Sequence, residues 1–252
     1  LLRDPNVRFD TPFLVGMHGL LASPGRSLFL YSPVALVGVG GLFVLARRDR
    51  SSAWLFGGMG LTFVLLISKM HQWDGGESYG PRYLVPVLPF LTVPVAAYFP
   101  LRSHLTSRLL LPAVLVLSVA MQIPGVLVDF SKIQNDYANR TDRYSIEMSR
   151  YSWPATPLVL NTKAALTAVP VNLRYVLGVA PVPAVELTGD VTRRDFSQQF
   201  AFSFDFWWLY LFYLGAVPAS IAVLLGLLPL AAASWMATRV RVALRSAVEV
   251  AV

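Results

Sequence analysis

Five blocks of apolar residues alternate with polar stretches along this chain. They cover residues 27–46, 53–68, 83–99, 109–128 and 207–236. The first four are close to the roughly 20 residues that an α-helix needs to cross the hydrocarbon core of a bilayer, and the fifth is long enough to tilt or to start in the interface. The pattern therefore predicts an all-α polytopic membrane protein with about five transmembrane helices.

Prolines interrupt the third, fourth and fifth blocks. They are Pro86, Pro89, Pro94, Pro112, Pro124, Pro218 and Pro229. Proline removes a backbone donor and bends a helix, and membrane proteins tolerate it where neighbouring protein satisfies the freed groups. We therefore expect the third block, with its three prolines, to be kinked and packed against protein rather than lipid.

The spacing of the blocks divides the chain into three regions. Residues 1–128 form a membrane region with four spans and two outer motif loops. Residues 129–206 form one long extracytoplasmic loop or small subdomain, partly helical over 129–153 and packed or interfacial, not spanning, over 173–185. Residues 207–252 form the last span and a basic tail, and four aromatic residues typical of a membrane interface open this span.

Composition agrees with a membrane protein. Hydrophobic residues make up 55% of the chain and charged residues 14%, against about 25% charged in average soluble proteins. Such a chain has too few charges to cover a soluble domain and too many apolar residues to be disordered. It contains no cysteine, which excludes disulfides, thiolate metal sites and a cysteine nucleophile.

The chain has a net charge of +7, and the positions of its basic residues predict an orientation. Arginines cluster after the first, third and fifth blocks, at positions 47, 48, 50, 102, 108, 239, 241 and 245. Short loops rich in Arg and Lys remain in the cytoplasm. We therefore expect a multi-pass plasma-membrane protein with basic loops and C-terminus cytoplasmic, and no nucleic-acid partner. The first 26 residues and the loops 69–82 and 129–206 then face outward.

The outer segment Ser23-Pro24-Gly25-Arg26 precedes the first block. Free N–H groups at a helix start beside an arginine can bind an anion such as a phosphate. An arginine that caps the loop or contacts lipid headgroups explains the same pattern, and the spacing alone favours this second interpretation.

The outer loop between the second and third blocks contains aromatic, glycine and charged residues. Trp73, Tyr79 and Tyr83 offer flat faces for a sugar ring. Arg82, at the head of the third block, can bind a phosphate. We predict a substrate-binding loop, although a plain hairpin with interfacial aromatic residues has a similar composition.

Acidic residues in the same loop suggest two further roles. Asp74 and Glu77 can bind hydroxyl groups or act as a general base. With His71 they provide the ligand types for a divalent cation, the one cofactor that the sequence suggests. Clusters of this size often arise by chance.

Other motifs are weaker. Arg and aromatic residues of the long loop, at positions 137, 140, 143, 144, 150, 151 and 153, can receive an acceptor or form a solvated face. The glycosylation triplet at residues 139–141 is common by chance. No Ser-His-Asp array, phosphate-binding loop, dinucleotide fingerprint or zinc spacing is present in the sequence.

The two outer motifs together resemble a known family. They are Ser23-Pro24-Gly25-Arg26 with Phe29 and Tyr31-Ser32-Pro33, and the run from Trp73 through Gly75-Gly76, Ser78-Tyr79-Gly80-Pro81-Arg82-Tyr83-Leu84 and Pro86 to Leu88-Pro89. The chain resembles bacterial GT-C superfamily membrane glycosyltransferases, similar to protein O-mannosyltransferases and lipid A aminoarabinose transferases. The resemblance covers about residues 16–99 and Asp205-Phe206-Trp207-Trp208.

The resemblance implies a polyprenyl-phosphate sugar donor and inverting transfer, on the extracytoplasmic face, to an acceptor lipid, glycan or protein. In this family the catalytic carboxylate usually lies in an outer loop near the N-terminus, and no residue here matches it. We therefore expect the chain, which begins at Leu1, to be the C-terminal part of a longer enzyme and inactive alone. Arg26 and Arg82 are the candidates for contact with the donor phosphate.

Two other classes remain as alternatives. A transporter or flippase for lipid-linked sugars would place polar residues at the bilayer midplane, where the predicted spans contain little beyond Gln122. A non-catalytic envelope-assembly membrane protein would need no catalytic carboxylate at all.

The orientation is testable by single-cysteine labelling, because the chain has no native cysteine. Cysteines substituted for Ser51, Ser103 and Ser246 should be protected from an impermeant thiol reagent in intact cells. Cysteines substituted for Ser78 and Ser197 should react. Labelling at position 103 from outside would contradict the positive-inside assignment.

Overall fold

The computed structural model describes residues 8–76, 78–101, 105–130, 133–134, 137, 146–183 and 204–250. Every element within these residues is helical, which confirms the predicted all-α class. The chain separates into two compact units, Leu1–Leu166 and Thr167–Val252. The division falls inside the region 129–206, because a helix of that region contributes one end to each unit.

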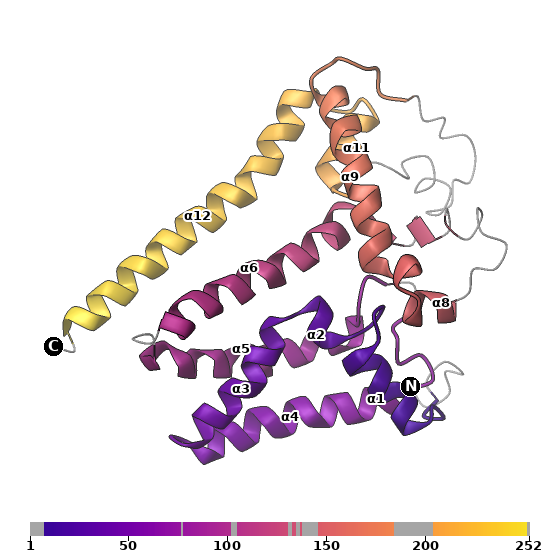
Figure 1. Ribbon diagram of the computed structural model, residues 1–252. Coiled ribbons are helices and arrows are strands. Elements are labelled where there is room, and N and C mark those ends of the chain that lie inside the picture. Colours follow the sequence, from indigo (N-terminus) through magenta and orange to yellow (C-terminus); the bar gives the residue numbers. More distant parts are fainter. Residues whose placement is uncertain are drawn as a thin grey trace. The chain divides into compact units, whose positions relative to one another are not determined.

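The first unit begins with four helices, α1 (Phe13–Ala22), α2 (Leu28–Tyr31), α3 (Val34–Ala46) and α4 (Arg50–Lys69) (Figure 1). The Asp49 side chain accepts a hydrogen bond of 3.1 Å from the Ser52 backbone N–H. This N-cap satisfies a backbone donor that the first turn of a helix leaves free. It fixes the start of α4, the second predicted span.

The prediction of one continuous span over residues 27–46 was wrong. The apolar block divides into α2 and α3, with Ser32 and Pro33 between them. Pro33 cannot donate a backbone hydrogen bond to the preceding turn, so α2 ends there. The remaining helix α3 has 13 residues and is about 20 Å long, shorter than the roughly 30 Å hydrocarbon core.

The third block is irregular, as its prolines predicted. It forms a 3₁₀ helix η1 (Arg82–Val87), a short α5 (Leu88–Thr92) and a second 3₁₀ helix η2 (Val93–Leu101). Its inner side chains are buried, with Leu84 at 0% and Val87 at 1% exposure. The expected irregularity and the packing of one side against protein are therefore confirmed, whereas Val85 and Val93 on the other side are exposed.

Close backbone contact joins this irregular segment to α3. A Cβ atom added at Gly38 would lie 1.9 Å from the Leu91 carbonyl oxygen, and one at Gly41 would lie 2.4 Å from that of Pro94. Real Cβ contacts are never so short. Glycine is therefore required at both positions for the two segments to approach.

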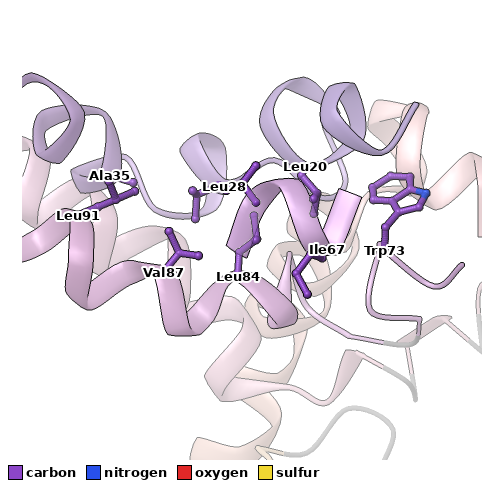
Figure 2. Packing of buried hydrophobic residues seen from close by; sticks show 9 residues of the cluster. Leu20, Leu28, Ala35, Ile67, Trp73, Leu84, Val87 and Leu91 are labelled. Carbon is purple, nitrogen blue, oxygen red and sulfur yellow. The ribbon is translucent and has the colours of Figure 1, made fainter. Parts of the chain in front are cut away.

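A hydrophobic core fills the space among α1–α5. Figure 2 shows its buried members, which come from every part of this region and include a tryptophan of the loop 69–82 between α4 and η1. They are Leu20, Leu28, Ala35, Val64, Ile67, Trp73, Leu84, Val87 and Leu91. The loop and the helices therefore share one core.

The rest of the first unit is built around α6 (Leu105–Leu127), which contacts α2 and α3. It is followed by α8 (Ile146–Tyr151), the 3₁₀ helix η3 (Trp153–Ala155) and α9 (Pro157–Val176). The helical turn α8 agrees with the partly helical character predicted for residues 129–153. A second buried cluster, of Val128, Ile133, Leu160, Ala164 and Ala165, packs the start of α9 in this unit.

Helix α9 was not predicted from the sequence. This 20-residue helix lies inside the predicted long loop, and the residues 173–176 that were expected to be packed or interfacial are its last turn. Polar residues such as Asn161 and Asn172 interrupt its apolar residues, so its sequence resembles neither a span nor an amphipathic helix. Both asparagines are buried and donate to backbone carbonyls, Asn161 to Val128 O at 2.6 Å and Asn172 to Ala168 O at 2.8 Å.

The second unit contains the end of α9, then α11 (Trp207–Tyr213) and α12 (Ala219–Val250). The fifth predicted span is divided here, because the chain turns at Gly215 (φ +72°) before Pro218. Leu209, Tyr213 and Ala222 form a small buried cluster, and the Tyr213 hydroxyl donates to the Asn172 side-chain oxygen.

Three helices among the described residues are long and apolar enough to cross a membrane, Arg50–Lys69, Leu109–Leu127 and Ala219–Arg239. They coincide with the second, fourth and fifth predicted spans. The predicted number of five is not reproduced, because the first and third blocks form shorter or irregular helices. Only 6% of the apolar window of α6 is buried, and the same holds for α12. The predicted sidedness stays a prediction.

The packing at Gly38 predicts opposite effects for two glycine-to-alanine changes. Gly38→Ala should destabilise the fold by roughly 1–3 kcal/mol, because the new methyl group collides with backbone. Gly58→Ala, in α4, has nothing within 4 Å of its Cβ position and should stabilise the helix by up to about 1 kcal/mol. Thermal unfolding of the purified variants in detergent measures both, and equal midpoints would contradict the close contact.

Candidate functional site

The Ser23–Arg26 turn joins α1 to α2 and is fixed by hydroxyl groups. The Ser23 hydroxyl donates to Gly19 O at 2.7 Å and accepts from the Arg26 backbone N–H at 3.1 Å. The Ser27 hydroxyl donates to Leu21 O at 2.7 Å and caps α2. The two serines therefore determine the direction in which the chain leaves α1.

Arg26 links this turn to the second motif. Its side chain is completely buried and donates to Gly25 O at 3.0 Å and to Gly76 O at 2.9 Å. Its guanidinium carbon lies 5.7 Å from the centre of the Phe130 ring. The two sequence motifs therefore meet, but the contacts of Arg26 are those of a residue that holds the loop, the interpretation that spacing alone favoured.

Trp73 is a core residue. It is 3% exposed, and its ring lies where a Cβ of Gly19 would be only 2.0 Å away. A ring in this position is closed to a sugar. Its contribution to the site is therefore to anchor the loop in the core.

Asp74 is paired with an arginine that the sequence had not linked to it. The carboxylate is 1% exposed. Its Oδ2 atom lies 3.0 Å from both Nε and Nη2 of Arg150, and the Arg150 guanidinium carbon lies 5.2 Å from the Trp73 ring centre. The two residues are 76 positions apart, so no local signal could have revealed the pair.

Tyr79 connects the loop to α6. Its hydroxyl donates to Met121 O at 2.5 Å, and its ring meets the Tyr31 ring edge to face at 5.1 Å. The Tyr31 hydroxyl in turn accepts a bond from the Leu158 backbone N–H at 3.2 Å. Tyr79 therefore closes one end of the loop against two helices.

Arg82 and Tyr83 lie nearer the surface. Arg82 is exposed and donates to the Tyr83 hydroxyl at 3.3 Å, with its guanidinium carbon 5.1 Å from the Tyr83 ring centre. Of the two arginines predicted to contact a phosphate, Arg82 is the accessible one.

The proposed metal ligands do not form a cluster in the part of the chain that the structure describes. His71 is exposed and its Nδ1 lies 2.9 Å from Asp10 Oδ1, a hydrogen bond that lowers the pKa of the Asp10 carboxyl. Asp74 is paired with Arg150, and Glu77 lies outside the described residues. Among the described residues no group of three or more His, Asp and Glu could hold an ion. A divalent cation stays a prediction.

A cavity of about 570 Å³ lies beside the loop in the first unit. It is formed by α2, the start of α3, the loop end with η1 and α5, and one face of α6. Its lining residues are Leu28, Tyr31, Ser32, Val34, Tyr79, Pro81, Arg82, Leu84, Val85, Leu88, Leu115, Ser118, Val119 and Gln122. Arg82 is the charged member of this set.

The polar groups of α6 at this cavity are used within the protein. The Ser118 hydroxyl donates to Val114 O and accepts from the Val34 backbone N–H, both at 2.8 Å. The Gln122 side-chain N–H donates to Tyr31 O at 2.5 Å. These bonds satisfy the backbone at the break between α2 and α3, and the remaining wall of the cavity is apolar.

The other predicted acceptor-binding residues differ in their contacts and exposure. Tyr151 stacks on His18 with ring centres 6.0 Å apart, and Trp153 is 54% exposed. Positions 140, 143 and 144 lie outside the described residues.

The aromatic residues that open the fifth block lie in the second unit. There Trp208 stacks on Phe206, with ring centres 4.6 Å apart, and Trp207 is 63% exposed.

Comparisons with known proteins add no family to these observations. No protein-family model matches the chain, and neither a curated protein nor a solved structure matches it. Any function must therefore be argued from the residues and the cavity themselves.

Proposed function

We propose that this chain is part of the membrane region of a glycosyltransferase. It takes a sugar from a polyprenyl-phosphate donor and transfers it to an acceptor at the extracytoplasmic face. The observation that supports this best is the apolar cavity with the accessible Arg82 in its lining.

The two halves of such a donor need different surroundings. An isoprenoid chain gains free energy when apolar surface covers it. A phosphate needs a cation, and the planar guanidinium of arginine binds two of its oxygens at once. The leucine and valine walls and Arg82 provide both within one cavity.

The cavity also suggests how a lipid reaches it. Val85, Leu115 and Val119 line the cavity, yet they are 58%, 44% and 64% exposed. Its open side is therefore apolar, and Leu115 and Val119 belong to a helix of membrane-spanning length. In a bilayer, a lipid-linked donor enters along this side without leaving the hydrocarbon.

The same cation has a chemical role in the proposed transfer. The phosphate leaves as negative charge develops on it, and a fixed guanidinium stabilises that charge. The base that deprotonates the acceptor hydroxyl is not Asp74, because its buried carboxylate is paired with Arg150. Glu77, which lies outside the described residues, is the remaining acid of this loop and its candidate for the base.

The contacts of the polar residues on α6 favour an enzyme over a transporter. A transporter presents polar groups near the midplane to its cargo. Here Ser118 and Gln122 bind backbone groups at the break between α2 and α3. Their side chains have a structural role that leaves the cavity wall apolar.

The cavity predicts a contrast between two valines of α6. Val119→Trp should fill the cavity and lower crosslinking of a photoactivatable polyprenyl phosphate in lipid nanodiscs by about tenfold, as expected for loss of about 1.4 kcal/mol of apolar contact. Val116→Trp is the matched control, because Val116 is 68% exposed on the same helix and does not line the cavity. Equal crosslinking of both variants would exclude this cavity as the lipid site.

Arg82 predicts a loss of donor use. In the active enzyme, Arg82→Ala should lower kcat/KM for the donor by about 30-fold, which corresponds to about 2 kcal/mol for one charge-assisted contact. Arg82→Lys should recover part of this loss, because lysine keeps the charge without the planar fork. Arg48→Ala, at an exposed arginine between α3 and α4, is the control. Unchanged kinetics in a folded Arg82→Ala protein would remove Arg82 from the site.

A further inference from the structure

The helical turn α8 contacts both motif segments, although it follows them by more than 50 residues. The Gly25 backbone N–H donates to Arg150 O at 3.0 Å. A Cβ at Gly25 would lie 1.9 Å from Ser149 O. The end of α8 therefore lies directly on the Ser23–Arg26 turn.

The Arg150 side chain extends further and contacts the loop 69–82. Its Nε donates to one oxygen of the buried Asp74, its Nη2 lies 3.0 Å from the same oxygen, and its guanidinium covers the face of Trp73. Arg150 itself is 25% exposed, whereas Asp74 is 1% exposed. One side chain therefore contacts the loop through an ion pair and through an aromatic ring.

The turn that contains Asp74 approaches Arg82 through the next residue, Gly75. The Cβ position of Gly75 lies 2.9 Å from Cγ of Arg82. The aliphatic part of Arg82 therefore rests on the backbone of the Asp74–Gly75 turn. A shift of this turn moves the surface against which Arg82 is held.

The loop needs such external contacts because its own backbone is permissive. Gly75 and Gly76 both have positive φ, at +79° and +62°, and glycine adopts many conformations at little cost. Arg26 binds the carbonyl oxygen of Gly76, and Arg150 binds the side chain just before Gly75. The two arginines hold the glycine pair from both sides.

We propose that Arg150 is a positioning residue for the cavity. It does not line the cavity, and it acts through Asp74 and Trp73 to fix the loop on which Arg82 rests. Its link to the donor rests on the function proposed above. Its effect on the loop does not.

The physical reason is the cost of a buried charge. Without Arg150 the Asp74 carboxylate loses its cation at a site shielded from water, which is strongly unfavourable. The loop then opens to hydrate the carboxylate, and the position of Arg82 is no longer fixed. Removing the carboxylate charge as well should relieve part of this effect.

The first experiment measures the loop alone. Ser78→Cys places a reporter thiol in the loop of a chain that has no other cysteine. Arg150→Ala should raise the rate of thiol labelling of the purified protein by about tenfold, the factor for loss of about 1.4 kcal/mol of local stability. Arg150→Lys and the double variant Arg150→Ala/Asp74→Asn should both lie between this variant and the parent.

Arg174→Ala is the matched control, because Arg174 is exposed on α9 and makes no side-chain hydrogen bond or ion pair within the described residues. It should leave the labelling rate unchanged. Equal labelling of the Arg150→Ala variant and the parent would overturn the proposal.

The second experiment measures binding of polyprenyl phosphate to the same variants, without Ser78→Cys, in nanodiscs. Arg150→Ala should weaken binding about tenfold, with partial rescue by Arg150→Lys. If Arg82→Ala weakens binding and Arg150→Ala does not, Arg150 has a structural role only and the proposal is overturned. If no variant, nor the parent, binds polyprenyl phosphate, the proposed function and the donor link both fail, while the labelling still decides whether Arg150 fixes the loop.

Discussion

The close contact between α3 and the proline-rich segment 82–101 is the constraint on which the rest of the first unit depends. Prolines at positions 86, 89 and 94 remove backbone donors, so this segment cannot form a complete set of helical hydrogen bonds. Such a segment is stable in an apolar environment only where protein covers it. Gly38 and Gly41 allow that cover at van der Waals distance.

Because the segment is held there, the loop before it has a fixed end. The loop begins at the end of α4, passes through Trp73 in the core and reaches η1 at Arg82. Three of its contacts use charge or hydroxyl groups, from Arg26, Arg150 and Tyr79. The result is a rigid wall for the cavity, built from a backbone that would be mobile by itself.

The sequence predicted the features that depend on local composition. Long apolar runs identified the helices α4, α6 and most of α12, and the prolines identified the irregular third segment. The break at Pro33 was missed, although that proline was visible, because long apolar runs lie on both sides of Ser32 and Pro33. Helix α9 was missed because polar side chains that bind backbone inside the fold look like loop residues in the sequence.

The residues of the site show a different limit. Sequence composition identified the right loop, yet it could not separate Arg26, which is buried, from Arg82, which is accessible. Sequence composition grouped Asp74 with His71 as metal ligands. In the structure Asp74 pairs with Arg150, and His71 pairs with Asp10. Partners of a charged side chain are set by contacts across 50 to 76 positions, and no local pattern encodes them.

The length of α12 has a consequence for the surroundings that suit this protein. Its apolar part, Ala219–Arg239, has 21 residues and extends about 31 Å, close to the roughly 30 Å of a hydrocarbon core. The apolar stretch ends at Arg239, whose guanidinium carbon lies 5.1 Å above the Trp235 ring. A tryptophan and an arginine at this point favour the headgroup level. An average bilayer would therefore accommodate this stretch upright, whereas a thinner one would make the helix tilt or kink, or would itself thicken locally.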